Sequence, residues 1–343
     1  MEQILNTLFV TQEGAYLHVD HEALKVEIPE QPPRLLPLLN IGSIVVMGNS
    51  MVSPQLMNRC TLEGRTITFL DYNGHFLARV EGEVSGNVLL RQAQYAMLEQ
   101  PKRALEAAKG FVAGKIRNCR LLLVRGAREL STAENSDLLK QAVEKMSRAL
   151  SHISKAQHLD DLRGLEGGAA AAYFAALPHL IRQDRDVWKF QGRNRRPPRD
   201  PVNAMLSFLY TILTHDVRSA LEGVGLDPQA GYLHALRPGR PALALDLMEE
   251  LRAVFVDRLI LARINLGQVK PENFKQRPGG AVEMSEEARK ELIAAYQTRK
   301  REEVVHPLTG RKVALGLIPH LQARVLARFI RGEGQGYVPF LAK

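Results

Sequence analysis

The chain has 343 residues, which suffices for one large or two ordinary domains with a substantial core, and we expect two. Its 45% apolar and 24% charged residues are ordinary for a soluble globular protein, whereas its net charge of +9 favours a polyanionic partner such as nucleic acid. The two cysteines are far apart and lack CxxC spacing, so neither a disulfide framework nor a thiolate zinc site is indicated. The N-terminus does not resemble a signal peptide and no apolar run approaches about 20 residues, which predicts a cytoplasmic protein outside the membrane.

Residues 4 to 88 contain short β-like runs separated by turn residues, which predicts a β-rich N-terminal domain spanning residues 1–95. The clearest hairpin joins residues 66–70 to 75–80 through Tyr72-Asn73-Gly74, because Asn-Gly supplies the positive φ angles of a tight turn. The Pro-rich residues 29–37 predict a loop. Residues 53–63 predict a short helix with Ser53 as its N-cap.

After Gln100-Pro101 the apolar period changes from two to nearly four, which predicts helices. They are expected near residues 102–125, 135–157, 166–178, 201–223, 242–264, 285–300 and 317–331. The predicted fold class is therefore α+β, with the β-rich N-terminal domain followed by a larger all-α C-terminal domain at residues 96–343. The segment GRNRRPPRDP at 192–201 interrupts the helices, since proline disfavours helical backbone.

The segment GYLHALRPGRPALALDLMEELR at 231–252 contains the strongest candidates for chemistry. Asp246 and Glu249 are three residues apart in a predicted helix and therefore share one face, and His234 precedes an Arg-Pro-Gly-Arg turn. Mg²⁺ or Mn²⁺ prefers carboxylate oxygen and tolerates an imidazole. Glu166, in RGLEGGAAAAYF, is the candidate third ligand.

Each of these residues also has an ordinary explanation. Glu166 could complement the dipole in the first turn of a helix, His234 could be a hydrogen-bonded structural residue, and Asp246 with Glu249 could lie on a solvated stripe. The surrounding leucines, however, predict a buried segment, and buried carboxylates need a cation. A metal ion or the guanidinium groups of Arg237 and Arg240 would supply it, and both possibilities stay open.

Basic residues cluster around the Pro-rich interruption, where Arg193, Arg195, Arg196 and Arg199 predict contacts to a DNA phosphate backbone. The alternative is a solvated flexible loop. Arg237 and Arg240 could clamp phosphates bidentately. Asn203, at the start of an apolar segment, could cap a helix or reach into the site, and the cap is favoured.

Four blocks of this sequence together resemble the CRISPR-associated adaptation integrase family, which acquires spacers. They are LNTLFVTQEGAYLHVD, RGLEGGAAAAYF, GRNRRPPRDPVNAMLSFLYTIL and GYLHALRPGRPALALDLMEELRAVFVDR, and the similarity continues to PFLAK. The resemblance implies a β-rich domain that forms a homodimer and a helical catalytic domain. LALDLMEELR and RRPPRD are most similar to the subtype I-C group.

The resemblance also implies a site and its partners. The family's metal-ligand positions fall on Glu166, His234 and Glu249, and Asp246 contributes in some members. Many relatives have Asp at the position of Glu249, which leaves open whether Asp246 or Glu249 binds directly. The implied reaction is Mg²⁺- or Mn²⁺-dependent phosphodiester transesterification that inserts double-stranded DNA fragments into CRISPR repeat DNA.

Further partners follow from the same resemblance. Two integrase dimers are expected around a dimer of the small second adaptation protein, and an accessory adaptation nuclease could assist. The alternative function is a non-catalytic nucleic-acid-binding scaffold. A zinc hydrolase is disfavoured, because only one histidine lies near the acids and no paired cysteines are present.

Overall fold

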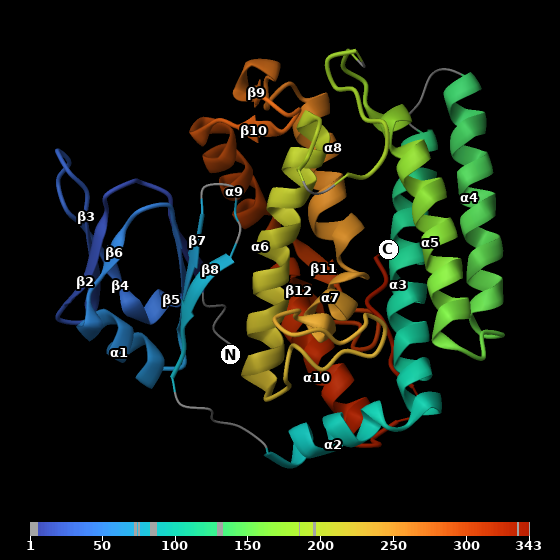
Figure 1. Ribbon diagram of the computed structural model, residues 1–343, viewed down its shortest axis with the longest axis horizontal. Coiled ribbons are helices and arrows are strands. Elements are labelled where there is room, and N and C mark those ends of the chain that lie inside the picture. Colours follow the sequence, from blue (N-terminus) through green and yellow to red (C-terminus); the bar gives the residue numbers. More distant parts are fainter. Residues whose placement is uncertain are drawn as a thin grey trace. The chain divides into compact units, whose positions relative to one another are not determined.

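The computed structural model (Figure 1) divides into two compact units, Met1–Gly86 and Asn87–Lys343. It describes residues 6–71, 74, 76–82, 88–128, 133–184, 186–194, 197–334 and 336–342. The predicted boundary at residue 95 is wrong, because helix α2 (Val88–Leu98) belongs to the second unit. The buried Gln94 amide fixes it there by donating to the carbonyl oxygens of Asp227 at 2.8 Å and Ala230 at 3.1 Å.

Among the described residues, the first unit contains two four-stranded sheets. One has the order β1 (Asn6–Val10), β5 (Ile41–Met47), β7 (Thr66–Leu70) and β8 (Phe76–Val80), and the other β4 (Arg34–Pro37), β3 (Ala23–Glu27), β2 (Tyr16–Asp20) and β6 (Met51–Val52). The predicted pairing of β7 with β8 is confirmed as antiparallel, although Tyr72 and Asn73 of its turn lie outside the described residues. The prediction of a loop over residues 29–37 is wrong in part, because residues 34–37 form strand β4. This strand lies at the edge of its sheet, where a proline such as Pro37 is tolerated.

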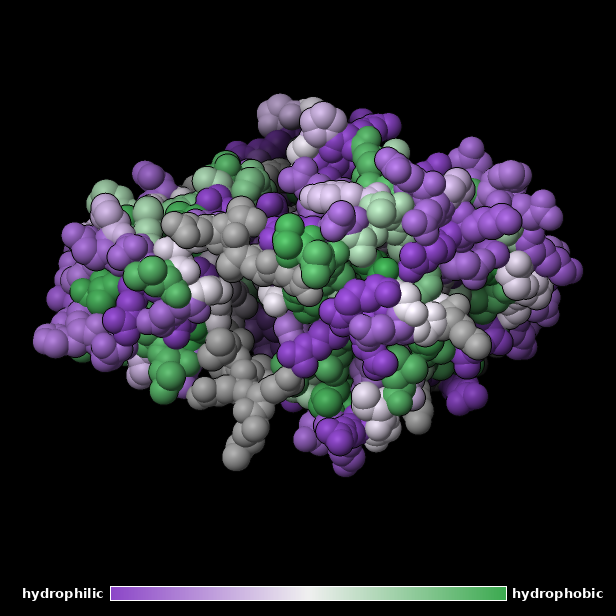
Figure 2. All heavy atoms as spheres, turned by 90° about the horizontal axis from the view of Figure 1, so that it is seen from below, coloured by the Kyte–Doolittle hydropathy of each residue, from purple (hydrophilic) through white to green (hydrophobic). Residues whose placement is uncertain are grey.

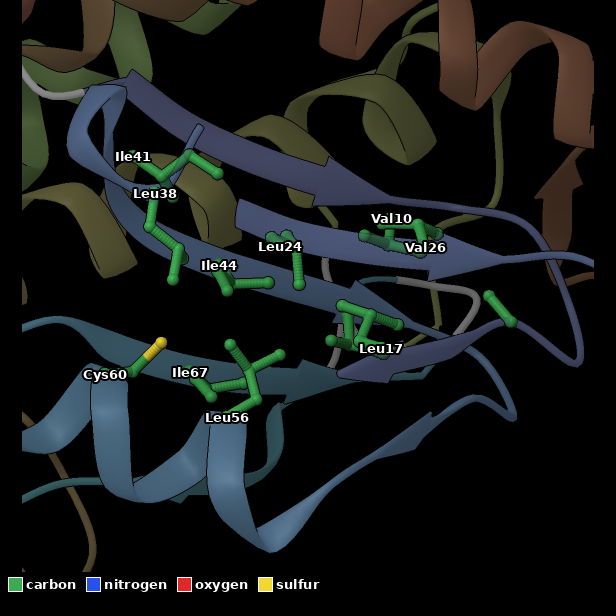
Figure 3. Close-up of a cluster of buried hydrophobic side chains, with 12 residues drawn as sticks. Val10, Leu17, Leu24, Val26, Leu38, Ile41, Ile44, Leu56, Cys60 and Ile67 are labelled. Carbon is green, nitrogen blue, oxygen red and sulfur yellow. The ribbon is translucent and has the colours of Figure 1, made fainter. Parts of the chain in front are cut away.

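The core of the first unit lies between its sheets and helix α1 (Pro54–Leu62). Figure 3 shows side chains from strands of both sheets and from α1 pointing toward one another, among them Leu17, Ile44 and Leu56. Ser53 caps α1 as predicted, since its Oγ accepts from the backbone N of Leu56 at 3.2 Å. The alternation of apolar residues along the strands therefore produces one shared core.

The second unit is mainly helical, and α3, α4 and α5 lie side by side (Figure 1). The α-helices that follow α2 are α3 to α10. Their bounds are α3 Pro101–Arg128, α4 Ala133–Ile153, α5 Leu159–Ala176, α6 Pro201–Val224, α7 Ala242–Met248, α8 Arg258–Asn265, α9 Glu286–Lys300 and α10 Ile318–Ile330. The single helix predicted at 242–264 is wrong, because a π-helix at Ala253–Asp257 separates α7 from α8.

The prediction of an all-α second domain is also wrong, because two short hairpins are present. Strand β9 (Phe274–Gln276) pairs with β10 (Val282–Met284), and β11 (Glu303–Val305) pairs with β12 (Lys312–Ala314). In the first connection Gly279 and Gly280 have φ angles of 93° and 83°, which glycine adopts readily. The α+β class itself is confirmed.

The surface in Figure 2 is largely hydrophilic, and its hydrophobic residues form separate groups on the face shown. Throughout the described part of the chain, every helix is too short or too polar to cross a lipid bilayer.

Candidate active site

Glu166 lies in the middle of helix α5, which begins at Leu159. The helix start is held instead by Asp161, whose Oδ2 accepts from the backbone N of His158 at 3.0 Å and of Gln157 at 3.2 Å. The alternative that Glu166 complements the dipole of a first turn is therefore wrong. Its carboxylate faces helix α3 and contacts the ammonium group of Lys115.

Lys115 joins Glu166 to Glu249 in a largely buried cluster of four charged side chains, of which Arg252 is the fourth. Its Nζ contacts Glu166 Oε1 and lies 2.6 Å from Glu249 Oε2, and Arg252 Nη2 lies 3.0 Å from Glu249 Oε1. The side chains of Lys115 and Glu249 are only 13% and 5% exposed. Lys115 and Arg252 thus supply the positive charge that buried carboxylates require.

The turn arginines do not have this role. Arg237 is exposed and Arg240 partly buried, and in the described structure neither forms an ion pair with Asp246 or Glu249. The sequence-based suggestion that these two guanidinium groups neutralise the acids is therefore wrong.

The charges of the cluster set its protonation state. Burial would raise the pKa of Glu249, but the positive charges of Arg252 and Lys115 outweigh it and lower this pKa to about 2. Burial would likewise lower the pKa of Lys115, yet the carboxylates of Glu249 and Glu166 raise it above its ordinary value. Glu249 is therefore ionised and Lys115 protonated at neutral pH.

The carboxylate of Asp246 organises the loop that carries His234. It is fully buried and accepts from the backbone N of Tyr232 at 2.6 Å, Leu233 at 2.9 Å and His234 at 2.9 Å. His234 Nδ1 lies 2.6 Å from its Oδ1, which leaves Nε2 facing Glu249 Oε1 at 3.8 Å. Both oxygens of Asp246 are engaged, so Glu249 is the acid that faces the cluster.

Gly231 allows this loop to approach helix α7 closely. A Cβ atom there would lie 2.7 Å from Asp246 Oδ2 and 2.6 Å from the backbone C of Ala242. Any side chain would therefore separate the loop from the carboxylate that holds it.

A second buried acid lies at the end of the π-helix. Asp257 accepts from the hydroxyl of Tyr173 at 2.6 Å and of Tyr210 at 2.5 Å. Its burial raises its pKa, an effect that these hydroxyls and Arg252 oppose. The guanidinium of Arg252 lies 4.7 Å from the centre of the Tyr210 ring, which links this acid to the charged cluster.

The charged cluster borders a cavity of about 740 Å³. Lys115, Glu166, Arg252 and Asp257 line one part of it. Apolar side chains complete the wall, namely Ala169, Ala170, Phe174 and Phe190 among others. The small residues after Glu166 thus leave open space beside the carboxylates.

The arginines predicted to bind DNA separate into two groups. Arg193 turns inward, where it lines the same cavity and donates to Asn203 Oδ1 at 2.7 Å and Ser207 Oγ at 3.0 Å. Arg199 is exposed and borders a second cavity of about 390 Å³ together with Lys189. Arg195 and Arg196 lie outside the described residues.

Asn203 is not the helix cap that the sequence predicted. Asp200 caps α6, since its Oδ1 accepts from the backbone N of Asn203 at 2.7 Å. The fully buried Asn203 amide donates to the carbonyl of Gly192 at 2.9 Å and accepts from Arg193. Asn203 therefore orders the Arg-rich loop that borders the cavity.

Sequence reasoning missed the roles of Lys115, Arg252, Asp257 and the two tyrosines. Only Arg252 carried a usable signal, namely its position three residues after Glu249. In the part of the chain that the structure describes, no three His, Cys, Asp or Glu side chains are grouped so as to hold a metal ion. Glu166 and Glu249 instead surround the Lys115 ammonium.

Residues 8–298 match the family described as CRISPR associated protein Cas1. The chain belongs to this family. A CRISPR-associated endonuclease Cas1 of Moorella thermoacetica is 48% identical over 341 residues, 99% of each chain. A CRISPR-associated exonuclease Cas4/endonuclease Cas1 fusion of Geobacter sulfurreducens is 34% identical over 98% of this chain and 60% of its own. The family resemblance seen in the sequence is thus confirmed.

Two solved structures share the Cas1 fold. A casposase bound to integration product has a TM-score of 0.82 at 21% identity, covering 97% of this chain and 93% of its own. A Cas6-RT-Cas1–Cas2 complex has a TM-score of 0.83 at 22% identity, covering 99% of this chain and 36% of the matched chain. At these identities the likeness concerns the fold.

Proposed function

We propose that this Cas1 chain is a metal-dependent DNA endonuclease and integrase that inserts short double-stranded fragments into CRISPR repeat DNA by phosphodiester transesterification. The observation that carries the proposal is that Glu166 and Glu249 both contact Lys115, which lines the 740 Å³ cavity, while His234 Nε2 lies 3.8 Å from Glu249 Oε1. The 48% identity to an endonuclease Cas1 over nearly the whole chain supports the same activity.

The donor atoms present are those that a hard divalent cation such as Mg²⁺ or Mn²⁺ accepts, although the Lys115 ammonium lies between the two carboxylates. Glu166 and Glu249 offer carboxylate oxygens and His234 offers Nε2, while Asp246 fixes the imidazole from behind. Glu249 Oε2 is buried and receives no well-aligned hydrogen bond, as expected of an oxygen that serves a cation. Asp246, whose oxygens are all engaged, orients the site and is not a ligand in this proposal.

When bound, such an ion supplies Lewis-acid activation of a 3′-hydroxyl or a water molecule and neutralises charge on the phosphate. The chain's own residues position the DNA strand. Arg193 and Arg252 line the cavity and attract phosphate oxygens, and Asn203 and Tyr210 keep these two guanidinium groups in place.

Sequence-independent DNA contacts are assigned to the basic residues outside the cavity. These are Arg195, Arg196, Arg199, Arg237 and Arg240. The exposure of Arg199 and Arg237 supports this role.

The same proposal includes partners. A homodimer formed through the β-rich unit, assembled in pairs around the small second adaptation protein, agrees with the presence of Cas1 and Cas2 in one complex of the same fold. The Cas4/Cas1 fusion supports an accessory nuclease. We also propose that the chain belongs to subtype I-C, because its segments LALDLMEELR and RRPPRD are similar to that group. A cytoplasmic location is proposed because the chain has only two, widely separated cysteines, which suits a reducing compartment.

The test is nicking of supercoiled plasmid with Mn²⁺, with and without a chelator, and strand transfer into a CRISPR repeat. Glu166→Ala should abolish both reactions and keep dimerisation and duplex binding. Glu144→Ala, which removes an exposed acid from α4, is the matched control and should retain both reactions. Wild-type protein that binds duplex DNA without nicking it would favour the non-catalytic scaffold instead.

A further inference from the structure

We infer that Lys115 is an internal counter-cation that competes with the divalent ion for Glu166 and Glu249. The inference rests on the metal site of the proposed function. Both carboxylates contact the same ammonium group, at Glu166 Oε1 and, 2.6 Å away, at Glu249 Oε2. The ammonium thus occupies the position between the two acids that a shared cation would take.

The geometry makes the two cations exclude one another. Glu249 Oε1 pairs with Arg252 at 3.0 Å and Oε2 faces the Lys115 ammonium that also contacts Glu166, so an ion shared by the two carboxylates would bind Oε2. Mg²⁺ binds oxygen at about 2.1 Å, and a contact of that length at Oε2 requires the Lys115 ammonium to withdraw. Lys115 has a flexible four-carbon stem and lines the cavity, which gives its ammonium space to move.

Charge favours the same conclusion. Glu166 and Glu249 carry two negative charges, and Lys115 and Arg252 carry two positive charges, so these four side chains have no net charge before any ion enters. A divalent ion entering with both cations in place would add two positive charges to this largely buried group, which is unfavourable. Replacing Lys115 by a neutral side chain leaves one net negative charge and should attract the ion.

The alternative is that Lys115 is a scaffold that holds the two carboxylates in position for the metal. This alternative predicts the opposite sign, because removal of Lys115 would then separate the carboxylates and weaken metal binding. Measured metal affinity therefore distinguishes the two roles without an activity assay.

The experiment measures Mn²⁺ affinity of the full DNA-free chain from the electron paramagnetic resonance signal of free Mn²⁺. Lys115→Met should lower the dissociation constant at least about tenfold, since it removes a charge in direct contact with both acids. The matched control is Lys109→Met on the same helix, which removes an ammonium paired with Glu106 at 2.9 Å and should leave the constant within about twofold of wild type. Glu249→Gln reports whether Mn²⁺ occupies this site.

The outcomes separate the counter-cation role from the metal site. If Lys115→Met binds Mn²⁺ no more tightly than wild type and Glu249→Gln does not bind it, the counter-cation role is overturned and the metal site is kept. Equal binding by wild type and Glu249→Gln shows that Mn²⁺ binds elsewhere, which refutes the proposed metal site itself.

If Lys115→Met unfolds without metal, Lys115→Gln and thermal unfolding give the answer. Mn²⁺ should then raise the melting temperature of the variant more than that of wild type. An equal or smaller increase overturns the inference.

Discussion

Replacing Asp246 by Asn tests whether this carboxylate orients His234. One Asp246 oxygen accepts from the backbone N and Nδ1 of His234, and the other accepts from the backbone N of Tyr232 and of Leu233. An asparagine amide keeps one acceptor oxygen and presents an NH₂ group to the other pair of donors. If its oxygen faces His234, two buried backbone N–H groups lose their acceptor.

The magnitude follows from these contacts. Each buried donor left without a partner costs roughly 1–3 kcal/mol, so Asp246→Asn should lower the free energy of unfolding by roughly 2–6 kcal/mol. Disturbing the partner of a metal-binding imidazole reduces metal affinity or activity about 10–100-fold. The expected phenotype is therefore a folded but less stable protein with slow, incompletely abolished Mn²⁺-dependent nicking.

Urea unfolding, Mn²⁺ affinity and the plasmid nicking rate measure the three effects. Asp227→Asn is the matched control, because Asp227 also accepts a backbone bond, from Gln229 at 2.8 Å, yet lies outside the charged cluster. If Asp246→Asn had the nicking rate and the free energy of unfolding of wild type, the orienting role of Asp246 would be refuted. Loss of Mn²⁺ binding as complete as in Glu249→Gln would show instead that Asp246 is itself a ligand.

Three other measurements test different parts of the site. Arg252→Gln leaves Glu249 with less positive charge and should lower the free energy of unfolding in urea by roughly 3 kcal/mol. Arg237→Gln, at an exposed position of the turn, should change it by less than about 0.5 kcal/mol, and similar effects of the two substitutions would contradict the assignment of Arg252. Burial raises the pKa of Glu250 to about 8 despite hydrogen bonds from Tyr337 and Gln322. The folded state therefore keeps a proton that the unfolded state releases near pH 4.5. The free energy of unfolding should accordingly fall as pH rises from about 4.5 to 8, by about 5 kcal/mol at most. Glu250→Gln should flatten that fall in urea titrations at pH 5 to 8, and an unchanged pH dependence would exclude Glu250 as its source. Duplex affinity should fall with salt at a log-log slope of roughly −5 for six neutralised phosphates, and a slope near zero would remove the basic residues from DNA binding.

The N-terminal elements could be predicted well because each depends on local chemistry. Alternating apolar residues predicted most strands, and Ser53 before Pro54 predicted the start of α1. The errors occur where distant contacts decide the structure. Helix α2 is fixed by Gln94 bonding to a loop more than a hundred residues later in the chain, and no local pattern announces that contact.

The sequence indicated the acids of the charged cluster but not the cations that pair with them. His234, Asp246 and Glu249 lie close in sequence, so their spacing indicated a shared site. Glu166 was the candidate third ligand, and the family resemblance pointed to the same residue. Lys115 comes from helix α3, far from all of these in sequence, and nothing in its neighbours distinguishes it from an exposed helical lysine. Only the packing of α3 against the other elements reveals that its ammonium is buried.

The π-helix explains how one segment places both Arg252 and Asp257 against Tyr210. Its wider turn is marked by the backbone bond from Arg258 N to Ala253 O, five residues apart. In a regular α-helix, residues five apart, such as Arg252 and Asp257, differ by about 140° in direction and could not easily contact one ring. Here Arg252 lies over the Tyr210 ring and Asp257 accepts from its hydroxyl. The irregular turn therefore directs a cation and an acid to the same tyrosine, and a continuous helix predicted from apolar periodicity would have lost this arrangement.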